Sequence, residues 1–217
     1  MRLTDDLYAY PWEGYDNNCN SFFFGGEVRC LIDPGHARFV DNLLASLSAD
    51  GVTQADIRLV IATHSHPDHL EGITRFAKLG LPVAIHPASL AYLQDVGRII
   101  YDFLASSVPE FEVAVELAEG PLAALDGLVE VYHTPGHEPG SVCLYWPATK
   151  ALATGDLIFF GGVGRTDFPL GSHEELMRQI DRLSALDVEY LLPGHGPTID
   201  SRAEVERNTK AVRRMFG

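Results

Sequence analysis

The stretch "ATHSHPDHLEG", residues 62–72, places three histidines and an aspartate within six consecutive positions. Histidine has only an intermediate preference for the interior, and aspartate is rarely buried without a partner, so a packed core does not require this cluster. Imidazole nitrogens and carboxylate oxygens are ligands for borderline divalent cations. The spacing therefore predicts a metal site that uses His64, His66, Asp68 and His69.

Three further candidate ligands each follow a short apolar run that reads as a strand. "LVEVYHT" leads into His137, "KALAT" leads into Asp156, and "VEYLL" leads into His195. A glycine precedes each of these three residues, and proline accompanies two of the glycines, so the backbone turns sharply where the strand ends. We therefore expect four strand ends to deliver five histidines and two aspartates to one rim.

Seven donors are too many for one tetrahedral ion, and they suit two ions. A water that bridges two cations loses its proton easily and becomes a nucleophile near neutral pH. None of the three cysteines stands at these strand ends, so a thiolate site is not indicated. We expect two divalent metal ions, with zinc favoured, and the same ligands also accept iron or manganese.

The surrounding pattern begins with strands and continues with alternating helices and strands. Strands are expected at 21–26, 27–35, 57–63, 81–86, 128–134, 141–146, 150–156 and 188–194. Helices are expected at 38–51, 70–80, 88–106 with a break near Gly97, 172–186 and 201–216, the fourth starting at a capping box of Ser172 and Glu175. Two such halves predict an α/β fold, a four-layer αββα sandwich with sheet packed on sheet and helices outside.

Composition indicates one soluble domain over residues 1–217. The net charge is −14, from 16 basic and 30 acidic residues, which argues against a nucleic-acid partner. Three cysteines without a C-x-x-C pair favour a reducing compartment. The N-terminus carries acids at positions 5 and 6 and does not resemble a secretory signal, and no apolar run approaches a membrane span. We expect a cytoplasmic protein with no membrane partner.

Several motifs of the sequence resemble those of a known family. "THSHPDH", "TPGHEPGS", "TGDLIFFGGVGRTD" and "LLPGHGP" together resemble the metallo-β-lactamase superfamily, over roughly residues 18–200 and most closely in its glyoxalase II-like (hydroxyacylglutathione hydrolase-like) branch. The resemblance implies a first metal on His64, His66 and His137. It implies a second metal on Asp68, His69 and His195, with Asp156 bridging both ions and Asp68 also acting as a catalytic proton acceptor.

The resemblance also implies supporting residues. Arg165 and Asp167 in "GRTDFP" are expected to brace the Asp156 loop, and Asp33 in "LIDPGH" is expected to support the mouth of the site. Four other histidines are assigned to the surface or to packing rather than to ligation: His36, His86, His133 and His173.

One departure from glyoxalase II concerns its C-terminal helical domain, which helps to hold glutathione and which this chain is expected to lack. Glutathione specificity therefore does not carry over. The segment 86–120 is a candidate pocket wall or lid, although its aromatics Tyr92, Tyr101 and Phe103 are favoured as core or as a subunit interface. An apolar face on 88–106 would suit a homodimer.

The favoured function is a binuclear metal hydrolase acting on a small-molecule thioester or related ester. The alternative is a mononuclear iron oxidoreductase similar to the persulfide dioxygenases, which would use only His64, His137 and Asp156. A nuclease is disfavoured by the acidic balance, and a β-lactam hydrolase is disfavoured because that branch usually exports its enzymes. A catalytically inactive binding module is disfavoured because all seven ligand positions are filled.

Overall fold

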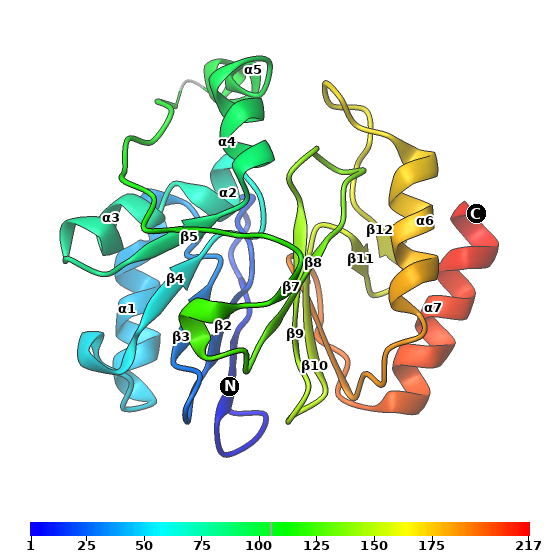
Figure 1. Ribbon diagram of the computed structural model, residues 1–217, viewed down its shortest axis with the longest axis horizontal. Coiled ribbons are helices and arrows are strands. Elements are labelled where there is room, and N and C mark those ends of the chain that lie inside the picture. Colours follow the sequence, from blue (N-terminus) through cyan, green and yellow to red (C-terminus); the bar gives the residue numbers. More distant parts are fainter. Residues whose placement is uncertain (105) are drawn as a thin grey trace.

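Two β-sheets pack face to face in the computed structural model, which describes residues 1–104 and 106–217. Helices α1 and α3 lie on the outer face of one sheet, with α2, α4 and α5 at its upper edge, and α6 and α7 cover the outer face of the other sheet (Figure 1). The predicted four-layer αββα sandwich is confirmed.

The first sheet is built by the N-terminal half of the chain. Its first three strands pair antiparallel as a meander, and the third to sixth strands pair parallel. Within the described residues its order is β1 (Leu7–Tyr10), β2 (Ser21–Phe24), β3 (Cys30–Ile32), β4 (Leu59–Ile61), β5 (Val83–Ile85) and β6 (Val115–Glu116). The parallel arrangement places the carboxyl ends of β3, β4 and β5 at the same edge.

The second sheet is built by the C-terminal half and is antiparallel except for the pair β10 and β13, which run parallel. Its order is β13 (Tyr190–Pro193), β10 (Ala151–Gly155), β9 (Val142–Trp146), β8 (Glu130–His133) and β7 (Gly120–Pro121). A small hairpin follows β10 and is formed by β11 (Ile158–Phe159) and β12 (Gly162–Val163).

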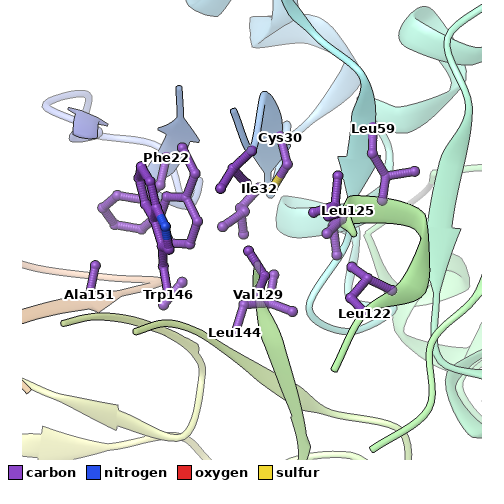
Figure 2. Close-up of a cluster of buried hydrophobic side chains, with 14 of the residues drawn as sticks. Phe22, Cys30, Ile32, Leu59, Leu122, Leu125, Val129, Leu144, Trp146 and Ala151 are labelled. Carbon is purple, nitrogen blue, oxygen red and sulfur yellow. The ribbon is translucent and has the colours of Figure 1, made fainter. Parts of the chain in front are cut away.

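Alternating side chains explain why these strands are apolar on both faces. In β3, Cys30 and Ile32 join the cluster between the sheets, whereas Leu31 faces the layer of helices. In β9, Leu144 points into the space between the sheets and Cys143 points toward α6. Figure 2 shows the cluster between the sheets, where side chains of both halves meet. Each fully buried side chain of this size contributes about 1.5–3 kcal/mol relative to exposure.

The helices lie close to the predicted ranges. They are α1 (Val40–Ala49), α2 (Pro67–Leu70), α3 (Ile73–Lys78), α4 (Pro87–Gln94), α5 (Arg98–Phe103), α6 (His173–Leu183) and α7 (Arg202–Phe216), with 3-10 turns η1 (Ala37–Phe39), η2 (Gln54–Asp56) and η3 (Ala123–Leu125). The predicted helix over 70–80 is instead divided between α2 and α3. The division falls at Gly72, whose N–H donates to the Gly35 carbonyl at 2.7 Å. A Cβ on Gly72 would lie 2.7 Å from the Pro34 carbonyl oxygen, so this close approach requires glycine.

The predicted capping box of α6 forms only in part. The Ser172 hydroxyl accepts a hydrogen bond from the Glu175 N–H at 3.3 Å, as expected for an N-cap. The Glu175 carboxylate, however, accepts from Arg178 and Gln179 on its own helix. The helix therefore begins where the sequence predicts, with a different partner for the glutamate.

The aromatics of segment 86–120 do not share one environment. Tyr92 and Tyr101 are buried, whereas Phe103 is 87% exposed on α5 beside the exposed Ile99 and Leu104. The expected packing role therefore fits both tyrosines, and a homodimer through an apolar face on residues 88–106 stays a prediction. None of the helices in the described residues has the length and apolarity needed to cross a bilayer.

Candidate metal centre

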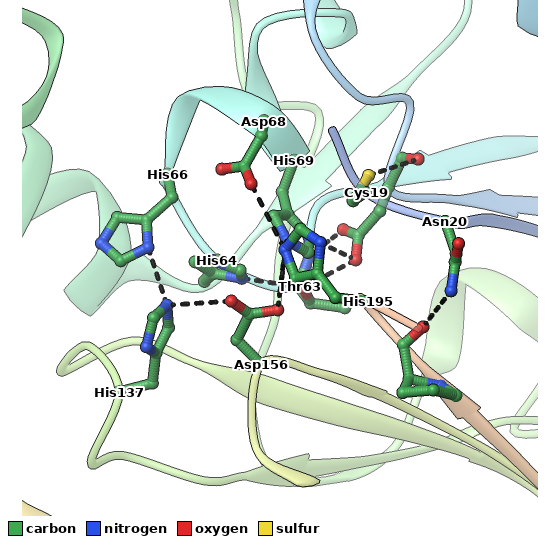
Figure 3. Close-up of polar contacts among 12 residues, drawn as sticks. Cys19, Asn20, Thr63, His64, His66, Asp68, His69, His137, Asp156 and His195 are labelled. Atoms are coloured by element: carbon green, nitrogen blue, oxygen red, sulfur yellow. Dashed lines mark hydrogen bonds and ion pairs between the residues drawn. The ribbon is translucent and has the colours of Figure 1, made fainter. Parts of the chain in front are cut away.

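The structure brings the seven predicted ligands together where the two halves of the fold meet (Figure 3). The segment after β4 carries His64 and His66, and α2 presents Asp68 and His69. The turns after β8, β10 and β13 supply His137, Asp156 and His195 respectively. The rigid strand ends therefore set where each side chain starts, as the sequence pattern indicates.

Three histidines form a first group. The ligand nitrogens of His64, His66 and His137 lie within 4.8 Å of one another, and all three side chains are buried. His66 Nδ1 faces His137 Nε2 at 2.7 Å. The other ring nitrogen of His137 is 2.7 Å from the Arg165 carbonyl oxygen and donates to it. That bond leaves His137 Nε2 with a lone pair directed into the group.

A second group consists of Asp68, His69 and His195. His69 Nε2 lies 3.3 Å from His195 Nε2, and His195 Nε2 lies 3.3 Å from Asp68 Oδ2. Ligands on a tetrahedral cation with bonds of 2.0–2.1 Å are separated by roughly 3.3–3.4 Å, so these spacings suit one ion. In the first group, one pair is closer than that, since His66 Nδ1 and His137 Nε2 are 2.7 Å apart.

Asp156 stands between the two groups. Its Oδ1 lies 3.2 Å from His69 Nε2 and 3.5 Å from His195 Nε2, while its Oδ2 lies 3.5 Å from His137 Nε2. One carboxylate oxygen therefore faces each group. Space for this carboxylate depends on Gly194, because a Cβ there would lie 2.5 Å from Asp156 Oδ1.

The protonation states of five of the seven ligands suit metal binding, whereas in His69 and His195 burial lowers the pKa but neighbouring carboxylates raise it overall. Burial, followed by the neighbouring imidazoles, holds the pKa of His64 well below its usual value. Burial also lowers the pKa values of His66 and His137, so these rings are neutral at pH 7 with free lone pairs. Burial alone would raise the pKa values of Asp68 and Asp156, but the surrounding histidines lower both, so the two carboxylates are charged.

Three buried atoms of the ligand side chains have no hydrogen-bond partner among the described residues. They are His64 Nε2, His66 Nε2 and Asp156 Oδ1. An unpaired buried polar atom costs about 1–3 kcal/mol, and bound cations would supply the missing partners. The donor set of five imidazoles and two carboxylates, with no thiolate, fits a pair of borderline divalent cations.

Comparisons with known proteins agree with this geometry. Residues 14–195 match the family model described as the metallo-beta-lactamase superfamily. The chain belongs to this superfamily. A probable metallo-hydrolase of Methanocaldococcus jannaschii is 30% identical over 203 residues, which cover 88% of this chain and 93% of that protein. Superfamily membership and the His/Asp cluster together indicate a metal-dependent hydrolase.

Two other similar proteins bear on the chemistry. The hydroxyacylglutathione hydrolase GloC of Haemophilus influenzae is 27% identical over 203 residues, covering 88% of this chain and 91% of its own. A protein known as TTHA1623, solved in a di-iron-bound form, superposes with a TM-score of 0.75 at 30% identity, covering 92% of this chain and 98% of that one.

The metallo-β-lactamase site is held by one predicted support residue. Asp33 is buried, and its carboxylate accepts from the Thr63 N–H at 2.7 Å and from the Thr63 hydroxyl at 2.8 Å. Its Oδ2 also contacts His69 Nδ1 at 2.9 Å. Burial alone lowers the pKa of His69, but Asp33 and Asp156 raise it overall. Asp33 therefore fixes the ring whose Nε2 faces the second group.

The expected role of Arg165 and Asp167 is wrong in its details. Their exposed side chains bond to each other, with Arg165 Nε 2.9 Å from Asp167 Oδ1. The loop instead contacts the site through its backbone, because the Arg165 carbonyl accepts from His137. A side-chain motif does not reveal which backbone carbonyl the fold turns inward.

Sequence reasoning missed three polar residues at the site. Asn17 donates to Asp68 Oδ2 at 2.7 Å, and Asn20 donates to the Pro193 and Gly196 carbonyls at 2.9 and 2.8 Å, which pins the turn that carries His195 (Figure 3). Glu138 is fully buried next to His137, and burial raises its pKa to about 7. The sequence indicates a role for Glu138 at the site through its place directly after the predicted ligand His137. The asparagines lie in a polar loop with no pattern of their own.

The remaining histidines lie outside the three potential metal-binding groups found among the described residues. His36 is buried and contacts Glu71 at 2.9 Å. His86 and His133 stack with ring centroids 4.2 Å apart, and His173 contacts the Phe216 carbonyl. These contacts match the expected surface and packing roles.

Proposed function

We propose that this metallo-β-lactamase-fold protein is a binuclear hydrolase of small-molecule thioesters or related esters. The observation that carries the proposal is the position of Asp156, whose two oxygens face a three-histidine group and an Asp-His-His group respectively. A carboxylate in this position can ligate one ion in each group at the same time, which supports a two-ion centre.

Each residue has a defined task in this proposal. His64, His66 and His137 would hold one ion, and Asp68, His69 and His195 would hold the other. Bound divalent cations polarise a substrate carbonyl and lower the pKa of water. Asp68 is ionised and lies at the edge of the second group, where it accepts the proton released as water attacks.

Several observations support the choice of substrate and setting. A relative named hydroxyacylglutathione hydrolase covers most of this chain, which favours a thioester. The net charge of −14 does not suit a nucleic-acid substrate. The three cysteines are free and buried, which supports a reducing compartment, and we propose the cytoplasm. We propose zinc as the metal, with iron as the next choice because a similar protein holds two irons.

The persulfide dioxygenase alternative requires only His64, His137 and Asp156. It leaves no task for the other four side chains, although three of them, Asp68, His69 and His195, form a group of potential ligands and the fourth, His66, lies with His64 and His137. Burying the two imidazoles of His66 and His69 and the carboxylate of Asp68 without a ligand would be costly. The arrangement therefore favours the hydrolase.

The test is elemental analysis of protein purified without added metal, followed by assays with a panel of thioesters and with glutathione persulfide under oxygen monitoring. We expect two ions per chain, thioester cleavage and no oxygen uptake. His66→Ala should abolish cleavage with little loss of fold, whereas the matched control His173→Ala, on the exposed start of α6, should not.

Two results would contradict the proposal. Full turnover in His66→Ala would refute the two-ion assignment and leave the one-ion alternative, because that alternative uses His64 instead. A single iron per chain together with oxygen uptake would replace the hydrolase with a dioxygenase.

A further inference from the structure

Ser65 lies between the ligands His64 and His66, and all of its polar groups are occupied. Its N–H and its hydroxyl both donate to Glu138 Oε2, at 3.1 and 2.6 Å. Its carbonyl accepts from the Tyr101 hydroxyl on α5 at 2.8 Å. The segment that carries two ligands of the first group is therefore held from both sides by buried side chains.

Glu138 connects that segment to the other half of the fold. It directly follows the third ligand, His137, and its side chain is fully buried. Its Oε1 accepts from the Ser89 hydroxyl on α4. Gly140 packs against the same helix so closely that a Cβ there would lie 2.1 Å from the Ser89 nitrogen. The turn between β8 and β9 thus rests on α4 through this carboxylate.

Burying the Glu138 carboxylate costs free energy of folding. A buried carboxylate is tolerated only when its hydrogen bonds are satisfied, and here three donors converge on it. An apolar side chain of similar size would fill the volume without that cost. What the carboxylate adds is geometry, because one rigid group is attached to His137 through the chain and to His64 and His66 through Ser65.

We propose that Glu138 is a positioning residue that sets the spacing of the three-histidine group, acting through a buried network with Ser65, Ser89 and Tyr101. This inference rests on the proposed binuclear centre. It concerns the first group, because the hydrogen bonds of Glu138 reach Ser65 between two ligands of that group, whereas His69 of the second group is held by a different carboxylate, Asp33. The consequence is a selective effect on one metal position.

The experiment compares Glu138→Gln with Glu112→Gln, a matched change at an exposed glutamate before β6. Stepwise Zn²⁺ titration against a chelating dye gives the affinity of each position, and Co²⁺ absorption reports the ligand geometry. His66→Ala shows which step belongs to the first group. We expect Glu138→Gln to weaken that step about 10–100-fold and to shift the Co²⁺ bands, with the other step unchanged.

A double variant sharpens the assignment. In His66→Ala the first position is already lost, so adding Glu138→Gln should leave the affinity of the remaining ion unchanged. Ser89→Ala and Tyr101→Phe each remove one hydroxyl from the network, and each should weaken the first step less than Glu138→Gln does. If Glu138→Gln does not fold, these two variants decide, and affinities equal to those of the control would overturn the inference.

The outcomes separate this inference from the proposed function. Failure of the unaltered protein to bind two ions would overturn both. Two ions in the unaltered protein, with Glu138→Gln equal to Glu112→Gln, would overturn the positioning role alone. Equal weakening of both steps would also overturn it, because that result indicates a general loss of structure.

Discussion

Replacing Asp33 with alanine should be one of the most damaging single changes outside the ligand set. The Asp33 side chain is almost fully buried and accepts three hydrogen bonds, from the Thr63 N–H, from the Thr63 hydroxyl and from His69 Nδ1. Its backbone also adopts the left-handed region, with φ at +52°. Alanine therefore removes three contacts and occupies an unfavourable conformation.

The magnitude follows from these contacts. The Thr63 hydroxyl can rotate to another partner, but the Thr63 N–H and His69 Nδ1 are left unpaired at about 1–3 kcal/mol each. The left-handed conformation costs an L-residue roughly 1–2 kcal/mol, and aspartate tolerates it better than alanine does. The free energy of unfolding should fall by about 3–5 kcal/mol, which lowers the melting temperature by about 6–20 °C in a chain of this size.

The matched variant is Asp33→Asn, which tolerates the same backbone conformation and keeps an oxygen for the Thr63 N–H. The free energy of unfolding of this variant should fall by only about 1–2 kcal/mol. Urea unfolding in the presence of a chelator measures the fold without metal, and repeating it with zinc measures the contribution of the ions. A loss below about 1 kcal/mol in Asp33→Ala, or equal losses in the two variants, would refute this reasoning.

Three further predictions concern other parts of the molecule. Gly136→Ala should cost about 2–4 kcal/mol, because φ there is +141° and a Cβ would lie 2.5 Å from the Leu176 backbone; Gly80→Ala, also at positive φ but with open space, should cost about 1–2 kcal/mol in the same urea experiment, and equal losses would contradict the clash. Burial, followed by the adjacent His133, lowers the pKa of His86 to about 4, so the unfolded chain binds a proton that the folded chain does not as pH falls from 6.5 to about 4. The free energy of unfolding should therefore fall by about 1–2 kcal/mol over that pH window at this half-buried site. His86→Asn, which keeps an acceptor for the Ala88 N–H, should reduce that fall. An equal fall in the variant and the unaltered protein would contradict the role of His86. Burial raises the pKa values of all three thiols, so a thiol reagent should react with none of them in the native protein and with all three in guanidinium, whereas fast native labelling would contradict the packing at Cys19, Cys30 and Cys143.

The sequence by itself determined the layered fold and the identity of the clustered residues. The continuous apolar runs "CLI" and "VCLYW" require two buried faces for each strand, which a sheet between two layers provides. Glycine and proline at the strand ends marked where polar side chains leave the sheet. The seven candidate ligands, the first of which is His64 and the last His195, were therefore identifiable because residues with ligand chemistry follow the strand ends along the chain.

Only the tertiary structure decided how those residues are held. The contacts of Asn17 with Asp68, of Asn20 with the His195 turn, and of Glu138 with Ser65 join positions 51 to 176 residues apart. The backbone carbonyl of Arg165, rather than its side chain, orients His137. The local sequence pattern does not predict such pairings, because they depend on how the two sheets pack together and on which groups that packing buries.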